Sequence, residues 1–144
     1  MGRLGANPKT SPVRILVVDD SEPMRRCLRN LLEQEDEWKV CSEAANGREA
    51  VEKAQQSTPD VIVLDFQMPE MNGLDAAREI RRRSPEIPIL MVTLHMSPQL
   101  EHHARTIGIR GACDKTDIGC VVEAVETLLH RGTYYRSSQS GGLG

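Results

Sequence analysis

The sequence lacks the long apolar run that a membrane-spanning helix requires. Such a helix needs roughly 20 consecutive apolar residues, and no segment of the 144 residues comes near that length. The N-terminal stretch MGRLGANPKTSP also lacks the apolar core of a secretory signal peptide. These two absences predict a cytoplasmic protein that does not enter a membrane.

The sequence also lacks positive net charge, zinc-finger cysteines and glycine-rich phosphate loops. The net charge is −3, which gives no general attraction to nucleic acid. The four cysteines form no C-x-x-C pair and have no accompanying His at zinc-finger spacing, so we expect four reduced thiols. They are Cys27, Cys41, Cys113 and Cys120. Neither G-x-x-x-x-G-K nor G-x-G-x-x-G occurs. We therefore expect no nucleic-acid binding by this domain and no structural zinc.

Short β-branched runs alternate with amphipathic helical segments along the chain. The expected strands span residues 13–20, 38–44, 61–65, 87–93 and 108–115. Apolar residues recur at helical spacing in the segments that follow these strands, which gives five helices. In the last helix, the residues expected to face the sheet are Ile118, Val122, Val125 and Leu129. The alternation is typical of βαβ units and predicts an α/β fold, with a parallel sheet covered by helices on both faces.

The central part of the chain differs in composition from its two ends. A length of 144 residues with 39% apolar residues suits one compact domain. The two ends are rich in Gly, Ser and Pro and show no apolar periodicity. We therefore expect a disordered N-terminal segment over residues 1–12, one domain over residues 13–132, and a flexible tail or linker over residues 133–144.

Polar residues stand where several of the expected strands end. Asp65 ends the third strand, Asp19 and Asp20 end the first, Thr93 ends the fourth, and Lys115 follows the fifth. Because ligands of open parallel sheets bind at the carboxyl ends of the strands, we expect these five side chains to converge. Three close carboxylates repel one another by several kcal/mol at an effective dielectric of about 20, which favours a bound cation. All-oxygen ligands favour Mg²⁺, and an ammonium with a hydroxyl suits a phosphoryl group.

The motifs LVVDD and VLDFQMPEMNG, together with Thr93 and Lys115, resemble the receiver domain of two-component response regulators. The likeness extends over nearly all of residues 13–132, and the spacing D-x-x-M-P-x-M-x-G is its most specific part. It implies a doubly wound, five-stranded parallel sheet in the flavodoxin-like order 2-1-3-4-5 with five helices. The stretches TLHMS, GIRGACDKTD and VVEAVETLLHRGTYY are most similar to receivers of the NarL/LuxR class.

The resemblance also assigns a role to each of these residues. Asp65 is implied to accept a phosphoryl group from a phosphohistidine or a small acyl phosphate. Thr93 and Lys115 are implied to contact that group. Mg²⁺ is implied as the cofactor, and its ligands would be Asp19, Asp20, Asp65 and the main-chain carbonyl of Gln67.

Three residues depart from the usual pattern of the family. Ala112 stands where an aromatic residue usually reports phosphorylation, Thr116 where a Pro usually follows the Lys, and Leu94 where a small residue usually stands. Because Ala112 replaces this aromatic residue, one alternative function is a docking module that binds its partner without phosphorylation. Another alternative is a Mg²⁺-dependent phosphatase with an Asp nucleophile, although Gln67 occupies the position at which such enzymes normally have a second Asp.

The resemblance finally sets expectations for activity and partners. We expect no enzyme activity beyond the domain's own phosphorylation and dephosphorylation. The expected partners are a sensor histidine kinase and an output domain or protein target on the face of the last two helices and strand, and a homodimer is also possible. NarL/LuxR receivers usually continue into a helix-turn-helix domain of about 60 residues. We therefore expect a single-domain regulator or a receiver separated from its DNA-binding domain.

Overall fold

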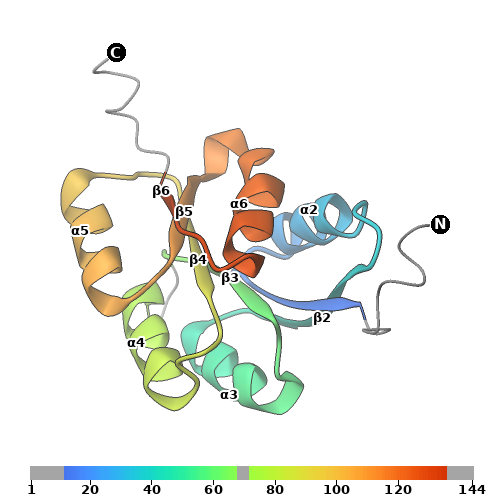
Figure 1. Ribbon diagram of the computed structural model, residues 1–144, viewed down its shortest axis with the longest axis horizontal. Coiled ribbons are helices and arrows are strands. Elements are labelled where there is room, and N and C mark those ends of the chain that lie inside the picture. Colours follow the sequence, from blue (N-terminus) through green and yellow to red (C-terminus); the bar gives the residue numbers. More distant parts are fainter. Residues whose placement is uncertain (1–11, 68–71, 136–144) are drawn as a thin grey trace.

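The computed structural model describes residues 12–67 and 72–135, in which strands and helices alternate (Figure 1). The strands are β1 (Val13–Val18), β2 (Trp38–Ala44), β3 (Val61–Asp65), β4 (Ile89–Thr93), β5 (Gly111–Asp114) and β6 (Tyr134–Tyr135). The helices are α2 (Glu22–Leu32), α3 (Gly47–Ser57), α4 (Gly73–Arg83), α5 (Pro98–Ile107), α6 (Cys120–Leu129) and the single 3₁₀ turn η1 (Lys115–Asp117).

The strands form one parallel sheet in the order β2-β1-β3-β4-β5-β6. This confirms the expected α/β fold, the order of its first five strands and, within the described ranges, the five α-helices. A short sixth strand, β6, pairs with β5 and extends the five expected strands. This strand, Tyr134–Tyr135, lies within residues 133–144, which the sequence assigns to a tail or linker. Residues 1–11 and 136–144 lie outside the described residues.

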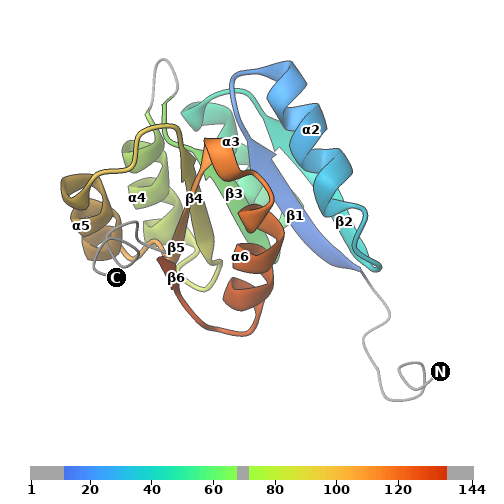
Figure 2. The ribbon, with the colours of Figure 1, turned by 90° about the horizontal axis from the view of Figure 1, so that it is seen from above.

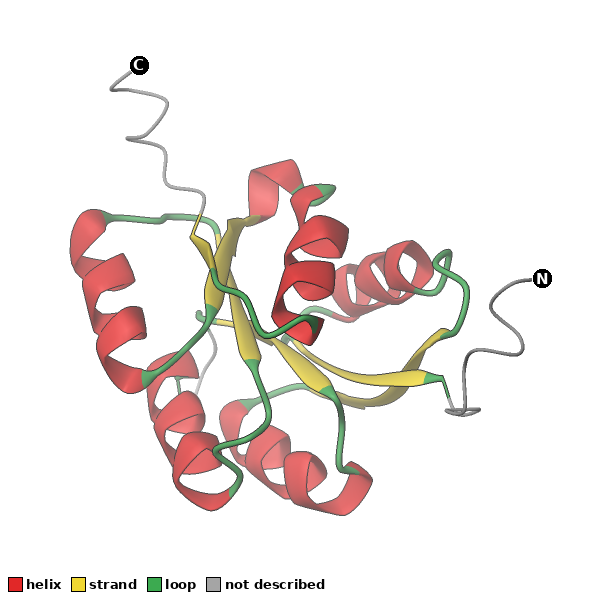
Figure 3. Cartoon of the chain, in the orientation of Figure 1, coloured by secondary structure: helices red, strands yellow, loops and turns green. Residues whose placement is uncertain are grey.

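Helices cover both faces of the sheet, as Figure 2 shows from above and Figure 3 shows by secondary structure. One apolar cluster joins α3, α4 and α5 to one face of the strands, and a second joins α2 and α6 to the other. Residues of β1 alternate between the clusters, since Leu16 and Val18 belong to the first and Ile15 and Val17 to the second. All residues of the central strands β3 and β4 are buried, as expected of strands that are covered on two sides.

The buried face of α6 differs from the expected one by about one residue. Its buried apolar side chains are Cys120, Val121, Ala124, Val125 and Leu128, whereas Val122 and Leu129 are only partly buried and Ile118 precedes the helix. Apolar residues occupy most positions of this helix, so two overlapping faces fit the sequence equally well. Packing against the sheet, which the spacing alone does not reveal, selects between them.

Each helix from α2 to α5 begins with a polar cap at the same edge of the sheet. The side chains of Ser21, Asn46, Asn72 and Ser97 accept a hydrogen bond from the main-chain N–H three residues further on. The four helices follow β1 to β4, so their N-termini lie near the carboxyl ends of those strands. Partial positive charge at helix N-termini favours anions at this edge. In the described ranges, every helix is too short to span a membrane.

Candidate functional site

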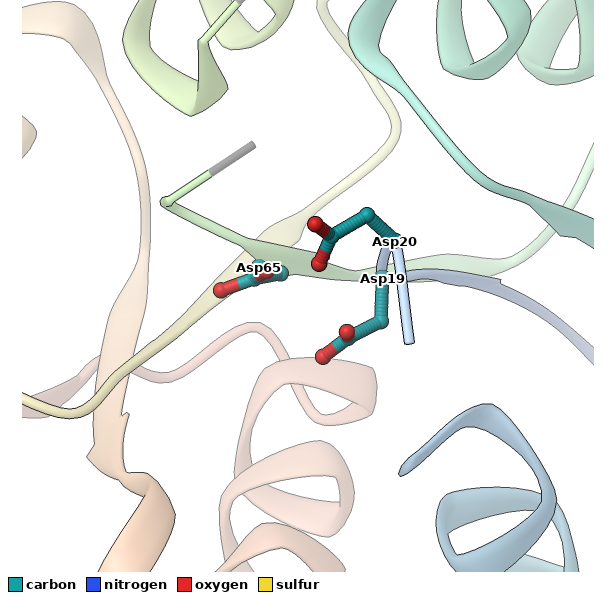
Figure 4. Close-up of side chains that lie close together, drawn as sticks. All are labelled: Asp19, Asp20 and Asp65. Carbon is teal, nitrogen blue, oxygen red and sulfur yellow. The ribbon is translucent and has the colours of Figure 1, made fainter. Parts of the chain in front are cut away.

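Three aspartates meet at the carboxyl edge of the sheet, as the sequence predicts. Asp19 and Asp20 follow β1, and Asp65 ends β3 (Figure 4). One carboxylate oxygen from each lies within 4.8 Å of the others. Asp19 and Asp65 are about 1% exposed, whereas Asp20 is exposed at the mouth of the cluster. Two charges are thus held away from water, and the third faces the solvent.

Lys115 joins the two buried carboxylates. Its Nζ lies 2.9 Å from Oδ2 of Asp19 and 3.2 Å from Oδ1 of Asp65, and the side chain is 11% exposed. Burial alone would lower the pKa of Lys115, but its hydrogen bonds to Asp19 and Asp65 and their charges outweigh burial and raise that pKa above 10.5. Lys115 therefore remains an ammonium and balances only one of the three carboxylates.

The two carboxylate oxygens of Asp65 differ in their contacts with the described residues. Oδ1 accepts a hydrogen bond from the main-chain N–H of Gln67 at 3.2 Å and also contacts Lys115. Oδ2 is buried and has no hydrogen-bond partner among the described residues. Burial and the charge of Asp19 raise the pKa of Asp65 above 3.8, and the contacts with Gln67 and Lys115 only partly offset them. A buried oxygen in this state fits a cation or a reacting group.

Thr93 lies at the end of β4 and is about 1% exposed. Its Oγ1 accepts a hydrogen bond from the main-chain N–H of His95 at 3.4 Å, so the hydroxyl hydrogen remains available to another acceptor. The structure thus brings Thr93 to the same edge as the aspartates. Among the described residues, Gln67 contacts the cluster through its main-chain N–H, which donates to Asp65; residues 68–71 of the motif lie outside the described residues. The role of the Gln67 carbonyl stays a prediction.

Sequence reasoning missed Asp114, which holds the turn that carries Lys115. Oδ1 of Asp114 accepts hydrogen bonds from the main-chain N–H of Thr116 at 2.8 Å and from its hydroxyl at 2.7 Å. These bonds lower the pKa of Asp114. Pro at position 116 would supply neither donor, so Thr116 suits this turn. An Asp two residues before a Thr is the sequence signal that could have revealed it.

Gly73 begins α4 and packs closely against the end of β3. A Cβ atom at Gly73 would lie 2.7 Å from Cα of Phe66 and 2.9 Å from the main-chain oxygen of Asp65. We expect Gly73→Ala to lower the free energy of unfolding by about 2 kcal/mol, because the backbone must move apart. Urea unfolding measures this. Gly119→Ala is the control, because a Cβ atom at Gly119 would come no closer than 4.0 Å to its nearest neighbour, Oδ1 of Asp117. Equal losses in both variants would contradict the prediction.

The raised pKa of Asp65 predicts a specific dependence of stability on pH. The folded state binds the Asp65 proton more tightly than the unfolded chain, so this group makes the protein less stable as pH rises from 3.8 through the raised folded value. Without divalent cations, the stability of Asp65→Asn relative to the unmodified protein should therefore increase over that range. Urea unfolding at several pH values measures the difference, and a difference that does not vary with pH would contradict the prediction.

The family model of the response regulator receiver domain matches residues 15–126. A crystal structure of a LuxR-family two-component response regulator from Aurantimonas sp. SI85-9A1 is similar, with a TM-score of 0.83 and 32% identity over 86% of this chain and 89% of that one. Transcriptional regulatory protein DegU of Brevibacillus brevis is 30% identical over 123 residues, which cover 85% of this chain and 52% of DegU.

Another relative corrects the expectation about enzyme activity. The protein-glutamate methylesterase/protein-glutamine glutaminase of Alkalilimnicola ehrlichii is 56% identical over 79 residues, which cover 55% of this chain and only 20% of that enzyme. The expectation that the protein is not an enzyme is contradicted, because enzymes are among its curated relatives. The chain spans between a fifth and about half of these relatives, and the family match covers most of the chain. The chain therefore belongs to the response regulator receiver domain family of two-component systems.

Proposed function

We propose that this receiver domain accepts a phosphoryl group on Asp65 in a Mg²⁺-dependent reaction. The observation that carries the proposal is the buried Oδ2 of Asp65, which has no hydrogen-bond partner among the described residues and lies beside two further carboxylates. Lys115 holds the other oxygen and supplies a cation next to the site. A carboxylate with one constrained and one unpartnered oxygen is suited to act as a nucleophile.

The donor set of the cluster fits Mg²⁺. Three carboxylates and one ammonium leave an excess of negative charge, and carboxylate and carbonyl oxygens are the ligands that Mg²⁺ prefers. Asp19, Asp20 and Asp65, with the main-chain carbonyl of Gln67, would hold the ion. Bound there, it would neutralise part of the charge on the oxygens of the transferred group.

The remaining chemistry belongs to side chains of this chain. Oδ2 of Asp65 attacks the phosphorus of a phosphohistidine or an acyl phosphate, and the bond from phosphorus to the donor nitrogen or oxygen breaks as the leaving group takes its electron pair. Lys115 lies within ion-pair distance of Asp65 and would contact a phosphoryl oxygen. The free hydroxyl hydrogen of Thr93 would donate to another. Addition of water to the phosphorus would later restore the carboxylate.

A sensor histidine kinase is the proposed donor, and phosphorylation is proposed to change the affinity of a surface for an output domain or protein target. The LuxR-family structure and DegU support an output in transcription, whereas the methylesterase relative supports an enzymatic one. The proposed surface consists of α5, β5 and α6, and it includes β6, which pairs with β5. The proposed receiver domain thus extends from Val13 to Tyr135.

The test is incubation of the purified protein with acetyl phosphate, with and without Mg²⁺, followed by intact mass measurement. We expect one added phosphoryl group in the presence of Mg²⁺ and none in its absence.

Asp20→Asn should weaken Mg²⁺ binding and raise the metal-free melting temperature, because it removes one repelling charge. Asp36→Asn, at an exposed turn, is the control. Unchanged Mg²⁺ binding in Asp20→Asn would exclude Asp20 as a ligand.

A further inference from the structure

Arg25 connects the acidic cluster to a neighbouring strand. It lies in the first half of α2, and its guanidinium donates to two acceptors on different elements. Nη1 donates to the main-chain oxygen of Asp19 at 2.7 Å, and Nε donates to Oε1 of Glu43 on β2 at 3.0 Å. The side chains of Arg25 and Glu43 are 18% and 21% exposed. A partly buried guanidinium that donates in two directions holds the main chain at Asp19 and the side chain of Glu43 at a defined separation.

The hydrogen bond from Arg25 to the main-chain oxygen of Asp19 affects the position of Asp20 more than that of Asp19. Asp19 is held independently, since its N–H donates to the main-chain oxygen of Ala44 and its carboxylate contacts Ser21 and Lys115. The carboxylate of Asp20 has no recorded hydrogen bond within residues 12–67 and 72–135, although it lies in the cluster (Figure 4). Because the peptide group is planar, fixing the carbonyl of Asp19 also fixes the plane from which Asp20 starts.

Glu43 keeps the charge of Arg25 directed away from the cluster. Nη1 of Arg25 already reaches the main-chain oxygen of Asp19, so a guanidinium without another partner could turn towards the carboxylates and compete with a cation. Glu43 instead pairs with Arg25 and also with Arg29, and its own main-chain oxygen accepts from Nζ of Lys53 on α3 at 2.9 Å. Glu43 is therefore anchored on the side of β2, which leaves Arg25 facing the cluster only through a neutral carbonyl.

We infer that Arg25, oriented by Glu43, is a positioning residue that sets the place of Asp20 for Mg²⁺ binding. The inference rests on the proposed function, because it concerns the same ion. Residues that orient metal ligands without touching the metal affect affinity by about 10- to 100-fold when they are replaced. A lysine in place of Arg25 lacks the second donor at a fixed angle and would keep only one of the two contacts.

The experiment is calorimetric titration of the unphosphorylated protein with Mg²⁺, with thermal unfolding measured in EDTA. We expect about tenfold weaker Mg²⁺ binding in Arg25→Met, a smaller loss in Arg25→Lys, and a loss in Glu43→Gln. Arg26→Met is the matched control, because Arg26 is on the same helix, is 65% exposed and pairs with Glu22. At saturating Mg²⁺, phosphorylation of Arg25→Met by acetyl phosphate should return to within about twofold of the unmodified rate.

The outcomes separate the inference from the proposal beneath it. Mg²⁺ affinity in Arg25→Met equal to that in Arg26→Met overturns the inference, even where the unmodified protein binds Mg²⁺ and is phosphorylated. A lower melting temperature with an unchanged Mg²⁺ affinity also overturns it, since a purely structural role gives that result. Failure of the unmodified protein to bind Mg²⁺ overturns the proposed function, and the inference with it.

Discussion

Replacing Asp65 with Asn is expected to abolish phosphorylation of the domain by acetyl phosphate. The amide has nearly the shape of the carboxylate but is not a nucleophile towards phosphorus, so the modification should be lost completely. The fold should remain, because Asp65 is repelled by Asp19 and its burial is unfavourable to its charge. Intact mass after incubation with Mg²⁺ and acetyl phosphate measures the loss, and a denaturation curve shows that the variant is folded.

An exposed aspartate outside the cluster provides the control for this result. Asp75 is exposed on α4 and pairs with Arg78 at 3.3 Å, outside the cluster. Asp75→Asn should be phosphorylated as the unmodified protein is. An Asp65→Asn variant that still gains one phosphoryl group would place the acceptor on another residue.

Replacing Lys115 with Met is expected to cause the largest loss of stability at this site. Methionine fills a similar volume but leaves Asp19 and Asp65 buried without their cation. Removal of one partner from a buried ion pair costs about 3 kcal/mol or more. Urea unfolding without divalent cations measures the loss, and Lys39→Met, an exposed position on β2, is the control.

The cause of this loss is open to a direct check by a double variant. If uncompensated charge is the reason, Asp65→Asn should recover part of the stability lost in Lys115→Met, because only one buried carboxylate then remains. The two changes should therefore not be additive, as is usual for groups in contact. A loss in Lys115→Met no larger than in Lys39→Met, or strict additivity with Asp65→Asn, would show that the ion pairs stabilise little.

The position of the acidic cluster could be predicted because it depends on strand ends and strand direction. The apolar run that ends in Asp65 and the one that ends in Thr93 both stop where β3 and β4 stop in the structure. In a parallel sheet, such ends necessarily share an edge. Lys115 could be placed for the same reason, since it directly follows β5.

Contacts between side chains far apart in sequence could not be predicted. Arg25 and Glu43 are 18 positions apart, and nothing in the spacing of charges marks them as partners. Two residues are also too few to show the alternation typical of a strand, so the sequence does not predict β6. The strand β6 depends on tertiary contacts. The hydroxyl of Tyr135 donates to the main-chain oxygen of Ile109, and the centroid of its ring lies 4.0 Å from the guanidinium carbon of Arg105.

The structure places an aromatic side chain from another strand next to Ala112. Its small side chain departs from the aromatic residue usual at this position, but Ala112 is paired in register with Tyr135 on β6. The ring of Tyr135 packs against the same apolar cluster to which Ala112 belongs. Burial raises the pKa of Tyr135, so its hydroxyl stays protonated and able to donate. An aromatic ring is thus present beside position 112, supplied by the next strand.

The direction of β6 decides where a reporter or fused domain should be attached. Because β6 runs parallel to β5, the chain at Tyr135 is heading towards the edge of the sheet that carries Asp65. At Val13, by contrast, the chain enters β1 from the opposite edge. A fluorophore joined by a short linker after Tyr135 therefore starts on the side of the carboxylates, whereas one joined before Val13 starts a strand length away. Sensors of phosphorylation built on this domain should use the attachment after Tyr135.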